Sequence, residues 1–344
     1  SPNGGEGTLR QALLNANGFP GVDVIQFGPG VSGTVFITGG ELLVSSALSI
    51  VGPGADLVTI SGDLDQSGDP TPGETRVFRI DDGDFDTVSD VTLSGLTISG
   101  GVALGDVYPA NAGGGILNYG ESLSLDQVTV SNNFARFGAG IENGGDLVVT
   151  RSRFTGNDAV ELGGGIDNFG SNLNVSDTTF SDNVAGFGGG GIENTGNAII
   201  HGSTFARNSA EKLAGAIDNF GGDLEIANST ISENVSQIGG GLVHEPGLMT
   251  IINCTVVENT PNLSQNANVG GGIDLTDAEN TTAKLDNSIV AGNVRLAGQA
   301  MIPSDVGGLP VSPLSCHNLI GDAASAGGLV DQENGNLAGI QAAG

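Results

Sequence analysis

An acidic segment between residues 63 and 74 carries oxygen ligands at the spacing of a twelve-residue calcium loop. It matches the pattern D-x-D-x-S-G-x5-E, and its candidate ligands are Asp63, Asp65, Ser67, Asp69 and Glu74. Oxygen atoms at these offsets can wrap around one hard cation such as Ca²⁺. Pro70 and Pro72 lie inside the segment and no helix precedes it, so an EF-hand is excluded. The sequence predicts a Ca²⁺ loop between strands, with a plain acidic surface turn as the alternative.

A second group of acids follows a recurring isoleucine, at Glu142, Asp167, Glu193, Asp218 and Asp274. On strands stacked about 4.8 Å apart these acids would form an outward row of carboxylates that raise one another's pKa values. A carboxylate pair at a suitable distance can hydrolyse a glycoside, and a row of them can bind divalent cations. The acid belongs to the repeat unit itself, which favours a structural role.

A third candidate group is basic and consists of Arg151, Arg153 and His201. A polysaccharide lyase needs a base, and it needs a cation or an arginine to neutralise the uronate carboxylate. These three residues are the best such set in the chain. The alternative is that they form ordinary ion pairs on an acidic surface.

The elements that must position these residues are set by an internal repeat. A glycine- or alanine-rich triplet followed by Ile or Leu recurs every 25 or 26 residues until the last step, at 113–116, 138–141, 163–166, 189–192, 214–217, 239–242 and 270–273. In the second half of each repeat, short runs alternate apolar and polar residues, which is the period of a strand. A fixed period of this length indicates a solenoid. The predicted fold is therefore all-β, a right-handed parallel β-helix of roughly eleven turns.

Equivalent positions of the repeats predict ladders of like residues inside the rod. One ladder is Ile116, Ile141, Ile166, Ile192 and Ile217, and another is Phe154, Phe180, Phe205 and Ile231. Two asparagine ladders comprise Asn118, Asn143, Asn168, Asn194 and Asn219, and Asn133, Asn157, Asn183, Asn208, Asn234 and Asn259. Stacked amides can hydrogen-bond along the axis. His244 replaces asparagine in the first of these, a break that could mark a groove.

The chain divides into three predicted parts. Residues 1–20 are a cap for the open edge of the first turn, with a helix at 8–17 that begins at a capping box from Thr8 to Gln11. Residues 21–300 are the β-helix. Residues 301–344 lose the period and are expected to form an irregular C-terminal cap or linker.

Composition limits the possible functions. The chain has 39 Asp and Glu against 10 Lys and Arg, a net charge of −29. Such acidity opposes binding to nucleic acid, and no apolar run approaches the roughly 20 residues of a membrane helix. The opening Ser1-Pro2 would suit a mature terminus after cleavage of a leader. Cys254 and Cys316 could pair, but two distant thiols do not define a framework.

Three stretches resemble secreted bacterial proteins. The Gly-Gly-x-Ile-x-Asn and Phe-x-x-Asn repeats resemble polymorphic outer-membrane protein repeats. The segment from Gly7 to Ala12, leading to 23–27, resembles the CSLREA-type N-terminal motif, with Gly7 in place of its Cys and Gln11 in place of its Glu. Residues 287–293 and 318–322 resemble the end of the β-helix in choice-of-anchor proteins. The resemblance implies the fold and export, and much less about activity.

Two functions from different classes follow. The first is a secreted or cell-surface structural or adhesive solenoid that associates with itself, end to end or laterally, or with extracellular glycans, with Ca²⁺ as its possible cofactor. The alternative is a polysaccharide lyase or glycosidase that acts in a groove along the rod, by analogy of fold alone. Strong acidity is also typical of proteins from saline habitats, and composition does not separate that origin from calcium use.

Overall fold

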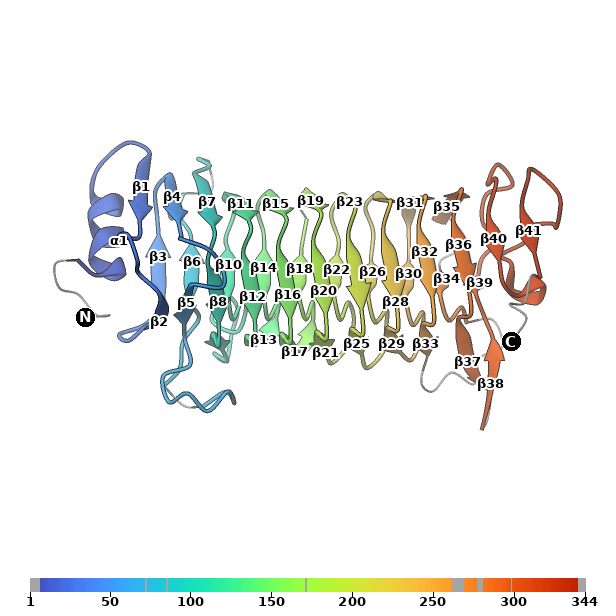
Figure 1. Cartoon of the computed structure of the whole chain (residues 1–344), viewed down its shortest axis with the longest axis horizontal. Coiled ribbons are helices and arrows are strands. Elements are labelled where there is room, and N and C mark those ends of the chain that lie inside the picture. Colours follow the sequence, from blue (N-terminus) through green and yellow to red (C-terminus); the bar gives the residue numbers. More distant parts are fainter. Residues whose placement is uncertain are drawn as a thin grey trace.

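The protein is a rod built from parallel strands, as seen in a computed structural model that describes residues 7–339 except 72, 85, 171, 262–268, 277–280 and 298 (Figure 1). Four sheets run along the rod, and each turn of chain contributes one strand to most of them. Neighbouring strands in a sheet come from successive turns and pair in parallel. The prediction of an all-β parallel β-helix is thus confirmed.

Sheets A and C form two walls of the rod. Sheet A consists of β1 (Asp23–Gln26), β4 (Leu48–Val51), β7 (Asp90–Ser94), β11 (Ser122–Asp126), β15 (Leu147–Thr150), β19 (Leu173–Ser176), β23 (Ala198–His201), β27 (Leu224–Ala227), β31 (Gly247–Ile252) and β35 (Thr281–Asp286). Sheet C consists of β3 (Leu42–Val44), β6 (Phe78–Ile80), β10 (Ile116–Asn118), β14 (Ile141–Asn143), β18 (Ile166–Asn168), β22 (Ile192–Asn194), β26 (Ile217–Asn219), β30 (Leu242–His244), β34 (Ile273–Leu275) and β39 (Val306–Gly308).

Sheets B and D complete each turn. Sheet B consists of β2 (Gly33–Phe36), β5 (Val58–Ser61), β8 (Thr97–Ser99), β12 (Thr129–Ser131), β16 (Arg153–Thr155), β20 (Thr179–Ser181), β24 (Thr204–Ala206), β28 (Thr230–Ser232), β32 (Thr255–Val257), β36 (Ile289–Ala291), β40 (Leu319–Ile320) and β41 (Leu337–Ala338). Sheet D consists of β9 (Val102–Ala103), β13 (Phe134–Phe137), β17 (Asp158–Leu162), β21 (Val184–Ala185), β25 (Ser209–Ala210), β29 (Val235–Ser236) and β33 (Thr260–Pro261). The chain passes from C through A and B to D and returns to C.

The interior ladders form as the repeats predict. Phe154, Phe180 and Phe205 are fully buried and their rings stack with centroids 4.7 Å apart. Asn118 donates its side-chain amide to Asn143 Oδ1 at 2.7 Å, and the same bond is repeated from turn to turn. The second asparagine ladder runs from Asn133 to Asn293 in the same way. These bonds satisfy the polar groups that the narrow core buries.

His244 continues the asparagine ladder instead of marking a groove. Its side chain is fully buried, and its Nδ1 lies 3.1 Å from Asn219 Nδ2. Burial lowers the pKa of His244. His244 therefore takes the place of asparagine as a hydrogen-bonding side chain in the core.

The N-terminal end of the rod is covered by α1 (Leu9–Gly18), which packs against β1 and β3. Thr8 is the N-cap and accepts a hydrogen bond from the Gln11 backbone N–H at 3.2 Å. The Gln11 side chain donates to Asn15 instead of returning to the N-cap, so only half of the predicted capping box forms. Figure 1 shows this helix at the blue end of the rod.

The solenoid geometry continues beyond residue 300, where an irregular cap was predicted. The hairpin of β37 (Val294–Ala297) and β38 (Ala300–Pro303) interrupts the turn, but β39 then joins sheet C, and β40 and β41 extend sheet B. The spacing of the repeat changes here, which hides it in the sequence, while Asn318 and Asn336 keep a ladder bond of 3.0 Å. A short 3-10 turn, η1 (Ala323–Ser325), follows β40.

Two further expectations concern the cysteines and the membrane. Cys254 and Cys316 are both free thiols in the structure. Across the described ranges no helix is long and apolar enough to cross a bilayer.

Candidate functional site

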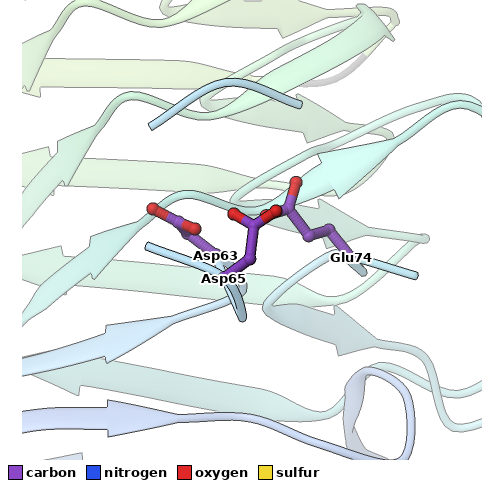
Figure 2. Close-up of side chains that lie close together, drawn as sticks. All are labelled: Asp63, Asp65 and Glu74. Carbon is purple, nitrogen blue, oxygen red and sulfur yellow. The ribbon is translucent and has the colours of Figure 1, made fainter. Parts of the chain in front are cut away.

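The predicted calcium loop connects β5 to β6 and stands out from the side of the rod (Figure 1). Its acids converge. A carboxylate oxygen from each of Asp63, Asp65 and Glu74 lies within 4.8 Å of the others, and Figure 2 shows the three carboxylates side by side. The fold of the loop at 63–74 therefore places three acidic side chains next to one another.

Short hydrogen bonds hold the loop in this form. Asp65 Oδ1 accepts from the Ser67 N–H at 2.9 Å, and Asp63 Oδ2 accepts from the Gly68 N–H at 3.1 Å. Glu74 Oε2 accepts from the Thr71 N–H at 2.7 Å, while the Thr71 hydroxyl donates to Asp65 Oδ2 at 2.9 Å. Gly68 has φ of +78°, a left-handed conformation that glycine adopts without strain. Glycine at the sixth position of the pattern therefore has a structural reason.

Each of two carboxylates keeps one oxygen without a partner. Asp63 Oδ1 and Glu74 Oε1 are shielded from solvent and accept no hydrogen bond. Leaving a buried charged oxygen unpaired costs free energy, and either a cation or a proton shared between the hydrogen-bonded Asp63 and Glu74 side chains supplies the missing partner. Among the described residues no lysine or arginine forms an ion pair with the three acids. The donor set therefore fits a bound cation.

The electrostatics of the loop agree with this reading. Hydrogen bonds from Ser67 lower the pKa of Asp65. Burial raises the pKa of Glu74, and the neighbouring charge of Asp63 raises it further. A divalent cation would remove this repulsion and favour the ionised form of Glu74.

The other two predicted ligands are placed differently. Ser67 Oγ donates to the Asp69 carbonyl at 3.0 Å, and neither side chain belongs to the group of converging carboxylates. Asp69 nevertheless lines a cavity of about 270 Å³ together with Asp63 and Glu74. The cavity lies between the loop and the rod.

Asp158 is the residue of this cavity that the sequence pattern did not reveal. It is the first residue of β17, and it lines the same cavity as Asp63 and Glu74. Partial burial raises its pKa. Its equivalents in adjacent turns are Phe134 and Val184, so an acid at this place departs from its column. That departure is the signal that could have identified it.

The row of acids on sheet C forms in register, but it is buried. Glu142 pairs with Asp167, and Glu193 pairs with Asp218, on successive strands. Their side chains point away from the core, yet the four residues are only 1–5% exposed. The turn from sheet D to sheet C covers them, and a methyl group on Gly188 would lie 2.7 Å from Asp218 Oδ2 and 2.9 Å from Glu193 Oε2. The expected open row is therefore sealed.

Burial dominates the titration of this row. It raises the pKa of Asp167 and of Asp218 to about 7, and it raises the pKa values of Glu142 and Glu193 well above the usual range. The predicted mutual elevation holds in one direction only: each aspartate raises the pKa of its glutamate partner, whereas the glutamate's hydrogen bond lowers the pKa of the aspartate, whose rise comes from burial. Glu142 is hydrogen-bonded to Asp167, and Glu193 to Asp218. Each pair holds a shared proton near neutral pH. Burial also raises the pKa of Asp274, to about 6.

The basic candidates lie on other elements. Arg151, at the corner between sheets A and B, forms an ion pair with Asp126 at 2.6 Å. Arg151 and Arg153 line a cavity of about 480 Å³ that also contains Asp56. His201 lies at the end of β23, with Nε2 2.6 Å from Asn228 Nδ2. Since the acids lie on sheet C, the structure does not bring the two groups into one cleft.

Comparison of the chain with known protein families, with curated proteins and with solved structures finds no match.

Proposed function

We propose that the protein is a calcium-binding β-solenoid that serves as a structural or adhesive component outside the cell. The observation that carries the proposal is the convergence of Asp63, Asp65 and Glu74, with two shielded oxygens that lack a partner. The secreted or bacterial cell-surface location rests on the resemblance to polymorphic outer-membrane protein repeats and to the CSLREA-type and choice-of-anchor segments. The parallel β-helix fold is compatible with that role.

Calcium is the cation that the donor set favours. The converging ligands are oxygen atoms only, whereas zinc sites use histidine and cysteine. Carboxylates on a loop also tolerate the large and irregular coordination sphere of Ca²⁺ more readily than the strict octahedron of Mg²⁺. Asp63, Asp65 and Glu74 would hold the ion, and Asp69 and Asp158 lie at the same cavity.

A cation at this place would fasten the loop to the rod. Arg76 already anchors the end of the loop, because its Nε donates to the Ala112 and Gly113 carbonyls at 2.9 Å. Asp158 comes from β17 on the rod, so an ion shared between Asp158 and the loop acids would link two separate parts of the chain. Calcium would thus stabilise a projecting loop that is otherwise destabilised by repulsion between its own charges.

Self-association is the second element of the proposal. Helix α1 covers the N-terminal ends of sheets A and C, which leaves fewer unpaired strand edges for end-to-end stacking. Lateral contact between rods is therefore the favoured arrangement, with Ca²⁺ offsetting the repulsion between chains of charge −29. Extracellular glycans are the alternative partner.

Isothermal titration of the calcium-free protein with CaCl₂ tests the proposal. Wild type should bind one Ca²⁺, and Asp63→Asn with Glu74→Gln should abolish that binding. Asp106→Asn is the matched control, since it removes an exposed acid of a neighbouring loop. Equal binding by all three proteins, or none by wild type, would contradict the proposal. Light scattering with and without Ca²⁺ then tests lateral association.

A polysaccharide lyase or glycosidase remains the alternative, and the arrangement gives it less support. The acids of sheet C are sealed, Arg151 forms an ion pair with Asp126, and His201 lies within hydrogen-bonding distance of Asn228. Incubation with acidic and neutral polysaccharides, read for unsaturated products and new reducing ends, tests it. Cleavage that is lost in Arg153→Ala would replace the scaffold proposal with an enzymatic one.

A further inference from the structure

A column of aromatic residues follows the corner between sheets C and A. The residues are Tyr119, Phe169 and Phe220, each directly after an asparagine of the buried ladder on β10, β18 and β26. They occur on every second turn, with Gly144 and Thr195 on the turns between. By the stacking of strands, neighbours in this column are separated by about 9.6 Å.

The aromatic column is accessible to a ligand. Phe169 is 38% exposed and Phe220 57% exposed. Tyr108, 39% exposed, packs on the same column, with its ring centroid 5.9 Å from both Tyr119 and Phe169. Both tyrosines of the chain therefore lie here, in a protein with only 4% aromatic residues and no tryptophan. A concentration of exposed rings in such a chain indicates a binding surface.

Glycine on the intervening turn makes room for one of these rings. A methyl group on Gly144 would lie 2.8 Å from the Phe169 ring. The Phe169 ring therefore lies over Gly144 and toward Tyr119. An aromatic residue thus alternates with a smaller residue along the corner, and Phe169 and Phe220 stay exposed there.

A second column of polar side chains runs beside the aromatic one. It consists of exposed acids and amides at Asp146, Asn172, Asn197 and Asp223. Asn172 Nδ2 donates to Asp146 Oδ1 at 3.1 Å, and the Asp223 N–H donates to Asn197 Oδ1 at 3.1 Å. These bonds fix the side chains while leaving carboxylate and amide groups for hydroxyl partners.

We propose that this corner binds a neutral glycan chain of β-1,4-linked pyranoses lying along the axis of the rod. The apolar faces of the sugar rings would lie on Phe169 and Phe220, and their hydroxyl groups would bond to the parallel column of acids and amides. The glycan is neutral because the acids Asp146 and Asp223 repel an anionic chain and accept hydrogen bonds from hydroxyl groups.

The spacing of the aromatic residues along the rod favours a β-1,4 glycosidic linkage. In an extended β-1,4-linked chain, successive sugars advance by about the distance between turns of the solenoid and face alternate sides. Every second sugar therefore presents the same face, and the aromatic residues also recur on every second turn. An α-1,4-linked chain curls and would leave the column after a few sugars.

This proposal names a partner for the surface role proposed above, and it does not require calcium. The aromatic column lies on the corner between sheets C and A, while the calcium loop lies between β5 and β6 on sheets B and C. Failure of calcium binding would leave the glycan surface intact. Failure of glycan binding would leave the calcium centre untouched.

The test is calorimetric titration with cellohexaose, compared with maltohexaose and with hexagalacturonate, each in Ca²⁺ and in EDTA. Wild type should bind cellohexaose equally in both buffers, and it should bind cellotetraose more weakly. Phe220→Ala should weaken binding about tenfold, which corresponds to the loss of one aromatic contact. Phe187→Ala is the matched control, an exposed phenylalanine on another corner.

Three results would overturn the proposal. They are binding of maltohexaose or hexagalacturonate as strong as that of cellohexaose, equal loss of affinity in Phe187→Ala and Phe220→Ala, and no binding of cellohexaose by wild type. Circular dichroism of each variant checks that the solenoid is folded, so that a loss of binding reports on the surface.

Discussion

The molecule contains two groups of carboxylates that differ in almost every respect. The acids of the loop at 63–74 converge on one point at the surface, and their neighbours in the chain hold them there. The acids of sheet C are spread along the rod and sealed under the turn from sheet D. The loop acids have no lysine or arginine ion-pair partner among the described residues, whereas burial raises the pKa values of the acids on sheet C.

The difference shows that residue type alone does not assign chemistry. The sequence predicted that the repeated acids are exposed, but they are buried. Alternation along a strand predicts only which side chains point away from the core, not whether other parts of the chain cover them. What covers the outer face depends on the path of the chain between sheets D and C. A cluster at one point, by contrast, is encoded by local spacing within a single loop.

The largest effect that separates the two groups should come from pH. The raised pKa values of Asp167 and Asp218 mean that the folded protein holds more protons than the unfolded chain between about pH 4 and 7. The contribution of these two groups to stability should therefore be fully present below about pH 4, and it should fall by on the order of 5 kcal/mol between pH 5 and pH 8. Arg76 opposes the shift at Glu142, and Glu245 reinforces it at Asp218. Thermal unfolding between pH 5 and 8 in EDTA measures the slope, and a flat or rising profile would contradict the shared protons.

Calcium should produce the next largest effect, and it should act through the loop alone. At a free Ca²⁺ concentration one hundred times the dissociation constant, binding stabilises the folded state by about 2.7 kcal/mol. We expect the midpoint of thermal unfolding at pH 8 to rise on addition of Ca²⁺ in wild type and to stay unchanged in Asp63→Asn with Glu74→Gln. The same rise in that double variant would show that the ion binds elsewhere.

Neutralising the buried row should stabilise the protein at high pH. Asp167→Asn with Asp218→Asn replaces two acids that resist ionisation, so the free energy of unfolding at pH 8 should rise by on the order of 1 kcal/mol, measured as a higher midpoint of thermal unfolding. Its response to Ca²⁺ should match that of wild type. Asp106→Asn controls for the general reduction of negative charge. If the row holds the ion, the calcium response will disappear in this variant.

The smallest effect concerns the link between loop and rod. Asp158→Asn removes a carboxylate that lines the cavity but does not belong to the group of three, so Ca²⁺ affinity should fall by about threefold. Asp69→Asn should have a similar or smaller effect. Calcium titration of both variants measures this, and a complete loss in Asp158→Asn would place the ion nearer to β17 than the three loop acids.

The fold and part of the candidate site could be predicted from the sequence, because both depend on the spacing of residues along the chain. The period of 25 or 26 residues predicted the ladders of Ile116, Phe180 and Asn183, since identical residues must stack in a parallel β-helix. The spacing of Asp63, Asp65 and Glu74 predicted their convergence. Asp158 was missed because its contact with the loop joins segments that are far apart in the sequence. The turns after residue 300 were missed because their spacing changes while their hydrogen bonds persist.

The most direct test is the anomalous scattering of calcium in crystals grown with CaCl₂. We expect one peak between the carboxylates of Asp63, Asp65 and Glu74, about 2.3–2.6 Å from their oxygen atoms. A map without a peak there, or with a peak on the row from Glu142 to Asp218, would contradict the assignment of the two groups of acids.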